Sequence, residues 1–182
     1  MKTSSEPVGL IEFSFPKAAP KEAVHVVFSE KKEDELITLE KGTKTLHLGI
    51  GTKAFSRRAF ILLPRRIISY AKSHRIAHLS IDLQTILSII TLEVISPEER
   101  VEIFAREAEI ANFDFVRYKT TPEEGWGFVQ SIAILGAGTR EKEAKKAVGR
   151  AKIVAYATNC ARVLSNIPGG DMTPKILVEK AK

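Results

Sequence analysis

The spacing of apolar residues divides the chain into segments that favour strands. Residues 8–15 alternate apolar and polar positions between two prolines, and residues 23–28 are rich in valine. A short apolar run covers 46–50, and residues 77–83 alternate strictly, which is typical of a half-buried strand. Residues 128–135 are apolar almost throughout, which indicates a strand in the middle of a sheet. The pattern therefore predicts five strands.

The stretches between these strands favour helices. After the third predicted strand a helical region extends to the start of the fourth, and Pro64 either kinks one helix or begins a second. The next helix has a sharper start, because Ser96 and Glu99 form a capping box and Pro97 occupies the first helical position. Apolar residues recur at helical spacing behind it. Helices thus alternate with strands along the sequence.

The remaining segments complete this pattern. The charged stretch 29–36 predicts a solvated loop, and 84–95 is ambiguous between strand and helix. Thr139 is predicted to cap a long helix that ends near Ser165. Beyond Ile153 this helix is apolar around its whole circumference, so we expect it to be buried between two layers or against a further domain. The alternation predicts an α/β layered domain with a mixed β-sheet flanked by helices.

Composition predicts a cytoplasmic domain. The chain has 182 residues, 44 % of them hydrophobic and 27 % charged, which suits one domain with a substantial core. The longest apolar run, residues 86–95, is too short and too polar to cross a bilayer. The first residues lack the apolar core of a signal peptide. Cys160 is the single cysteine, so no internal disulfide is expected and a reducing compartment fits.

The net charge of +6 is unevenly distributed. Residues 41–81 contain nine basic residues and no acid, whereas residues 82–116 contain eight acids and two basic residues. One interpretation is that two neighbouring elements present complementary faces to each other or to a partner subunit. The other is a nucleic-acid surface, since basic clusters attract phosphates. Its candidate residues are Arg57, Arg58, Arg65 and Arg66.

Two glycine turns follow predicted strands. The first contains Gly49, Gly51 and Lys53, and the second contains Gly136 and Gly138. Backbone amides at the start of a helix attract anions, so Gly49, Gly51 and Lys53 are a candidate anion-binding turn. A free-standing module could use both turns to bind a nucleotide such as ADP-ribose. A tight passage from strand to helix also explains the glycines without any ligand.

Other reactive side chains are sparse. His74 and His78 have the spacing of a helical metal pair, but the chain passes there from helix to strand, which points the two rings apart. We therefore predict no metal site. Cys160 is expected to be a small structural thiol and Asp82 an acid that caps a neighbouring loop. No catalytic motif is present, so the residues alone indicate a binding or interface module.

The tail predicts that the polypeptide continues. A turn-rich stretch over 166–174 ends at Thr173, a good N-cap, and Pro174, which suits a first helical position. The helix that they open, residues 175–182, has only about two turns and no stop signal. We therefore expect further structure beyond Lys182.

This tail also carries a family resemblance. The sequence ARVLSNIPGGDMTPKIL at 161–177 resembles the interdomain signature of the leucyl aminopeptidase (cytosol aminopeptidase) family, approximately Ala-Arg-x-Leu-x-Asn-x-Pro-x-Asn-x-x-Thr-Pro-x-x-Leu. LHLGIGTK at 46–53 is similar to its glycine-rich turn, and EIANFDFVRYK at 109–119 to its Glu-Gly-x-x-Leu-x-x-Tyr-x-Phe-x-x-Tyr-Lys stretch. Gly170 replaces the usual Asn and Ile110 the usual Gly, which marks a divergent member.

The resemblance implies a two-domain metallo-exopeptidase that removes Leu-like residues from the N-termini of peptides with two divalent cations (zinc, manganese or magnesium). It implies a macro-domain-like, three-layer N-terminal domain over 1–160. Residues 161–182 would be the interdomain segment and the start of a catalytic domain. The catalytic and metal-binding residues would all lie beyond Lys182, so this chain alone would bind no cofactor and be inactive. It further implies a homo-hexamer.

Overall fold

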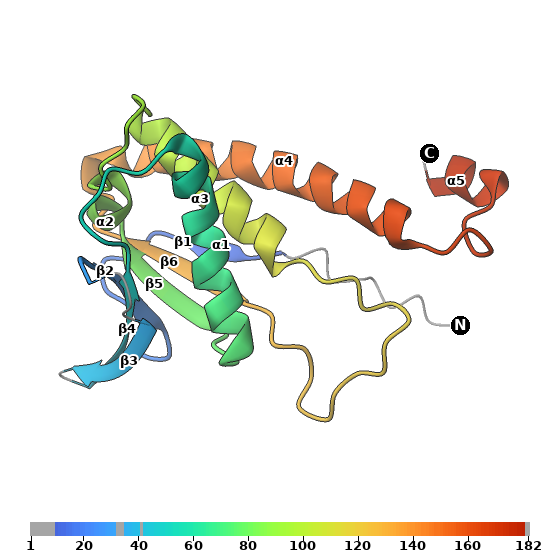
Figure 1. Cartoon of the computed structure of the whole chain (residues 1–182), viewed down its shortest axis with the longest axis horizontal. Coiled ribbons are helices and arrows are strands. Elements are labelled where there is room, and N and C mark those ends of the chain that lie inside the picture. The colour runs from blue at the N-terminus through green and yellow to red at the C-terminus, as the bar shows by residue number, and fades with distance from the viewer. Residues whose placement is uncertain (1–9, 32–34, 41, 181–182) are drawn as a thin grey trace.

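The computed structural model describes residues 10–31, 35–40 and 42–180, which form a six-stranded sheet and the helices that flank it (Figure 1). The strand order is β1-β6-β5-β2-β4-β3. Only β3 runs antiparallel to its neighbour, β4, so the sheet is mixed. This confirms the predicted α/β class. The strands are β1 Glu12–Ser14, β2 Val24–Ser29, β3 Glu35–Glu40, β4 Thr43–Gly49, β5 His78–Asp82 and β6 Ser131–Leu135.

Three long helices dominate the rest of the described chain. Helix α3 contacts both α1 and α4, and the second half of α4 extends away from the sheet towards α5 (Figure 1). Within the described residues, no helix is long and apolar enough to cross a membrane. The helices are α1 Arg57–Ser73, α2 Leu83–Leu87, α3 Pro97–Asn112, α4 Glu141–Asn166 and α5 Pro174–Lys180, with a 3₁₀ turn at Gly138–Arg140.

The core lies between the sheet and α1 and α3. The connections β4-α1-β5 and β5-α3-β6 both move towards β1, and right-handed crossovers therefore place both helices on the same face of the sheet. Alternate strand residues point to that face. The fully buried side chains from the strands are Leu46, Leu48, Val26, Leu79, Ile81, Ile132 and Ile134, and those from α1 include Phe60, Leu63, Ile67 and Ile68.

Side chains on the opposite face pair across neighbouring strands. His25 lies beside Ser80 in register, with Nδ1 of His25 3.1 Å from Oγ of Ser80. Nδ1 of His78 is 2.9 Å from Oγ of Ser131 in the same way. These imidazole–hydroxyl contacts satisfy polar groups at partly buried positions. The sheet is therefore apolar towards α1 and α3 and largely polar on its other face.

The helix starts test the sequence signals directly. Oγ of Ser96 accepts a hydrogen bond from Glu99 N at 3.2 Å, which confirms the predicted cap of α3. Oγ1 of Thr173 accepts from Ile176 N at 3.4 Å, as predicted for α5. The prediction for Thr139 was wrong, since that residue lies in the 3₁₀ turn and α4 begins at Glu141 without a side-chain cap. Acids in the first turn of α4 favour its positive end instead.

Other boundaries also differ from the predictions. Helix α1 continues through Pro64 as a single helix. The ambiguous segment contains the short helix α2 and then continues to α3 without a further strand. Strand β3 was not predicted, and its first two residues fall in the stretch 29–36 that was predicted to be a loop, of which 32–34 lie outside the described residues. Strand β1 covers only part of 8–15, and residues 8 and 9 are likewise not described.

Candidate functional site

A crevice of about 380 Å³ lies at the carboxyl ends of β2 and β4. The two strands end together, because Ile50 N donates a hydrogen bond to Ser29 O at 2.8 Å. The opposite wall comes from α2 and from the residues that follow it, Ile89 and Ile90. Strand β2 has β4 on one side and β5 on the other, and the loops after these strands surround its end. Open α/β sheets usually bind their ligands at such an edge.

The candidate anion-binding turn forms part of this crevice. Gly51 and Lys53 line it, and Gly51 has a φ of 74°, a left-handed value that favours glycine. Gly49 ends β4 just before the crevice, and its carbonyl accepts a hydrogen bond from Nη1 of Arg66 at 3.3 Å. Glycine at position 51 is therefore explained by the sharp exit of the chain from the sheet.

The start of α1 already has hydrogen-bond acceptors. Oγ of Ser56 accepts from Ala59 N at 3.2 Å. The carboxylate of Glu93 accepts from Arg57 N at 2.8 Å, so an acid of this chain lies where an anionic ligand of the helix would bind. The glycine turn is also separated from the helix by residues 52–56. The helix start and the turn therefore do not form one phosphate cradle.

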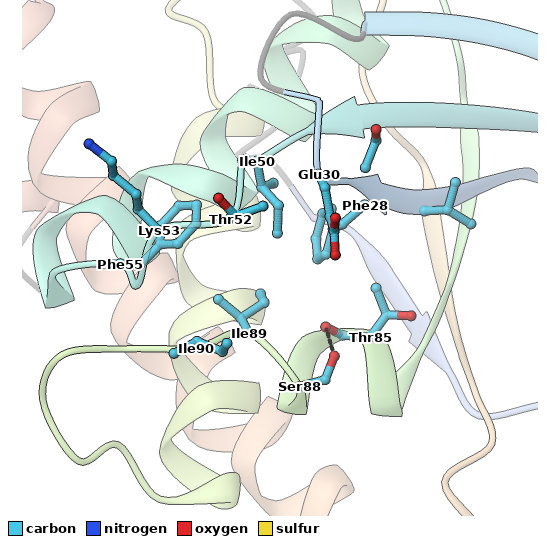
Figure 2. A pocket seen from close by; sticks show the side chains of 13 residues that line it. Phe28, Glu30, Ile50, Thr52, Lys53, Phe55, Thr85, Ser88, Ile89 and Ile90 are labelled. Atoms are coloured by element: carbon cyan, nitrogen blue, oxygen red, sulfur yellow. Dashed lines mark hydrogen bonds between the residues drawn. The ribbon is translucent and has the colours of Figure 1, made fainter.

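The charged side chains of the crevice point in different directions. Figure 2 shows the Glu30 carboxylate directed into the crevice, towards Thr85 and Ser88, and the Lys53 ammonium at the outer edge, directed away from it. Oγ of Ser88 donates to Thr85 O at 3.3 Å. The charged group that faces the interior of the crevice is thus a carboxylate. Phe28, Ile50, Phe55 and Ile89 add apolar surface, so the crevice fits a small group with apolar and hydrogen-bonding parts.

Most of this wall was not identified from the sequence. Glu30, Thr85 and Ile89 come from segments that are far apart in the chain and are brought together only by the strand order. No local motif marks them. The second glycine turn lies elsewhere: Gly136 and Gly138 have φ values of 67° and 48°, but neither lines the crevice. Nothing in this arrangement supports a nucleotide that contacts both turns.

The basic and acidic segments neutralise each other across α1 and α3. Arg65 Nε donates to the Glu107 carboxylate at 2.8 Å, and Lys72 Nζ lies 2.5 Å from the Asp114 carboxylate. Arg57 pairs with Glu99 in the same way. In each pair the two residues are 42 positions apart, because the helices run parallel in register. The charge pattern therefore reflects complementary neighbouring faces, and Arg57 and Arg65 of the nucleic-acid hypothesis have carboxylate partners among the described residues.

The remaining candidates lie apart from one another. His74 is the C-cap of α1 and stacks on Tyr70 with ring centroids 4.0 Å apart, whereas His78 begins β5. In the described part of the chain, no cluster of three or more His, Cys, Asp or Glu side chains could hold a metal ion. Asp82 Oδ2 lies 3.3 Å from Nε2 of His25 across β5 and β2. Cys160 is half-buried on α4.

Burial perturbs one acid strongly. Glu109 is 2 % exposed, and desolvation raises the pKa of its carboxyl group from 4.5 to about 7, although a hydrogen bond from Ile11 N at 3.1 Å and the nearby ammonium of Lys152 oppose the shift. This group joins α3 to the chain before β1, with α4 alongside, and it lies outside the crevice. Its position indicates a structural role.

Comparison with solved structures identifies the fold. A mutant of tomato leucine aminopeptidase matches with a TM-score of 0.71 at 17 % identity, over 99 % of this chain and 42 % of that chain. The bottromycin maturation enzyme BotP matches with a TM-score of 0.65 at 15 % identity, over 86 % of this chain and 35 % of that chain. BotP in complex with Mn matches with a TM-score of 0.60 at 16 % identity, over 87 % and 35 %.

These matches establish the fold that the sequence resemblance implied, a mixed sheet flanked by helices. The chain spans less than half the length of each of the three matched chains. No protein-family model matches the sequence. No curated protein matches it either. The likeness is therefore one of structure at low sequence identity.

Proposed function

We propose that residues 1–160 form the N-terminal domain of a leucyl aminopeptidase, and that residues 161–182 lead into its catalytic domain. The carrying observation is the fold match with tomato leucine aminopeptidase, which uses 99 % of this chain but only 42 % of that one. The remainder of such a protein is long enough for a catalytic domain. The intact protein would release N-terminal amino acids from peptides in the cytoplasm.

The chemistry of this proposal belongs to the catalytic domain. Two divalent cations, zinc, manganese or magnesium, would activate a water molecule for attack on the peptide carbonyl. The match with BotP in complex with Mn supports the proposal that the intact protein depends on a metal. Residues 1–182 would serve assembly and access to the active sites of a hexamer, and would be inactive alone.

The surface of α4 supports a further domain or subunit. Ile153, Val154 and Tyr156 are 71 %, 46 % and 54 % exposed, although they lie on a 26-residue helix that buries Ala147 and Ala151 just before them. Leu177 and Val178 of α5 are also exposed. Exposed apolar groups that are neighbours on a surface usually mark an interaction site. Their place, next to the tail that resembles an interdomain signature, fits a contact with the catalytic domain.

Three tests address the proposal. The coding sequence beyond Lys182 should encode an Asp-rich, Lys-containing metal-binding segment, and its absence would contradict the proposal. The protein encoded by the complete reading frame should hydrolyse leucine 4-nitroanilide with Mn²⁺ and lose this activity with a chelator, whereas residues 1–182 should release no 4-nitroaniline. Hydrolysis by residues 1–182 alone would place catalytic groups in this chain and refute the assignment. Light scattering of the intact protein should give the mass of a hexamer.

A further inference from the structure

A second cavity, of about 580 Å³, lies between α1, the end of α3 and α4, away from the crevice. It is lined by three cationic side chains, Arg65, Lys72 and Arg162, against one acid, Asp114. Ile110 and Phe113 add an apolar wall. The cavity thus combines an excess of positive charge with apolar surface.

Two of the three cations are largely engaged. Lys72 Nζ contacts the Asp114 carboxylate at 2.5 Å and lies 3.4 Å from Asn112 O. Arg65 uses Nε and Nη2 for the buried carboxylate of Glu107. Since a guanidinium carries two further hydrogens on Nη1, Arg65 retains that donor group. Arg65 therefore uses only part of its hydrogen-bonding capacity within the chain, although its charge is paired.

Arg162 differs from both, because no carboxylate of the described residues lies within ion-pair distance of it. Its Nη1 donates to Ile110 O at 2.7 Å and to Asn159 Oδ1 at 3.1 Å, which uses both hydrogens of that nitrogen. The guanidinium also stacks 4.3 Å from the centroid of the Phe113 ring. These contacts fix the group and leave Nε and Nη2, the pair that binds carboxylate or phosphate with two parallel bonds.

The electrostatics of this site favour an anion. Partial burial, followed by repulsion from Arg65, lowers the pKa of Arg162, although Asp114 opposes the shift. The larger cause is thus the cost of burying the charge, and the smaller one shows that a second positive charge, that of Arg65, lies close to Arg162 at the same cavity. Ser69 lies one helical turn from Arg65 on α1, lines the same cavity, and has a hydroxyl group that can donate a further hydrogen bond.

We propose that this cavity binds the oxyanion group of a small organic phosphate or carboxylate, held by Arg162, Arg65 and Ser69. The two Arg162 donors Nε and Nη2 contact two oxygens of the anion, and Ser69 donates to it from α1. The apolar wall formed by Ile110 and Phe113 accommodates the carbon part of the ligand. This site is independent of any peptidase activity.

Calorimetric titration of the purified chain with inorganic phosphate and, separately, with citrate tests the proposal at constant ionic strength. At least one of the two anions should bind, and the stronger one identifies phosphate or carboxylate as the preferred group. Arg162→Gln should weaken binding about tenfold or more, the effect of losing a charge-assisted hydrogen-bond pair. Arg58→Gln removes the same charge from an exposed side chain of α1 outside the cavity and should leave the affinity unchanged.

Ser69→Ala covers the case in which Arg162→Gln fails to fold, because Ser69 is exposed at its position and its change leaves the contacts of Arg162 intact. It should weaken binding about threefold. Absence of binding by both anions would overturn the proposal. An equal loss of affinity in Arg58→Gln would also overturn it, since binding would then depend on net charge alone. Unchanged affinity in both single variants, Ser69→Ala and Arg162→Gln, would overturn it as well.

Discussion

The seam between α1 and α3 and the second half of α4 differ in which side chains find partners within the chain. At the seam, three cations of α1 meet three acids on or just after α3, and the side chains beneath them form the core. In the second half of α4 the reverse holds. Val154 and Tyr156 lie at the surface, and so does Ile153 at the middle of the helix, which is 71 % exposed.

This contrast shows which surface features point to a partner. A run of nine basic residues suggests a binding surface in the sequence, yet Arg57, Arg65 and Lys72 have carboxylate partners within the chain. From the sequence, the apolar residues of α4 predict a buried helix, yet several of them are exposed in the structure. Burying apolar area stabilises by about 25 cal/mol per Å², so an uncovered apolar face has more to gain from a partner than a neutralised charged one.

Glu109 lies on α3 next to α4 and provides the largest predicted effect. Its pKa of about 7 exceeds the unfolded value of 4.5, so the folded chain holds one more proton between these pH values. The stabilising contribution of the protonated acid is full below pH 4.5 and is lost as the pH rises through 7. At about 1.4 kcal/mol per unit, the loss amounts to about 3 kcal/mol.

Glu109→Gln should remove this pH dependence, because the amide stays neutral while its oxygen still accepts from Ile11 N. Urea unfolding at several pH values between 4 and 8 measures the change in free energy. Glu143→Gln changes an exposed acid of α4 and should retain the wild-type slope. Identical slopes for Glu109→Gln and the wild type would contradict the prediction and indicate that Glu109 is ionised in the fold.

The second prediction concerns the middle pair of the seam. The Glu107 side chain is 5 % exposed and accepts from both Arg65 and Arg106, so Glu107→Gln leaves two guanidinium groups without a carboxylate. The free energy of unfolding should fall by about 2 kcal/mol, since hydrogen bonds to charged groups are lost at a buried acid. Glu141→Gln provides the control, because its pair with Lys145 is exposed and contributes under about 0.5 kcal/mol. If Glu107→Gln and Glu141→Gln lowered the free energy of unfolding equally, the distinction between the seam and the outer surface would be lost.

The parts of the fold that the sequence predicted correctly depend on local signals. The cap at Ser96 and the alternation before Asp82 require only neighbouring residues, and both are present in the structure. Strand β3 was missed because its apolar residues follow a charged run and have their hydrogen-bonding partner in β4, beyond the turn at Gly42. Thr139 was assigned wrongly because the chain makes a 3₁₀ turn before α4, which a cap preference does not reveal.

The candidate sites show the same limit. Gly51 and Lys53 could be identified from a turn pattern, but their opposite wall, including Thr85 and Ile89, depends on strand order. The pairing of Arg65 with Glu107 required two helices to run parallel in register. The sequence could show that opposite charges were segregated, and only the packing of α1 on α3 showed that they neutralise each other.

The smallest predicted effect on stability is at the exposed face of α4. Ile153→Ser should change the free energy of unfolding by less than about 0.5 kcal/mol beyond the modest helix preference of serine, because the side chain has little buried area to lose. Ala151→Ser, two residues earlier, places a hydroxyl group at a fully buried position and should cost more. A large loss for Ile153→Ser in urea unfolding would mean that this face packs within the chain, and it would remove the main surface argument for a docking partner.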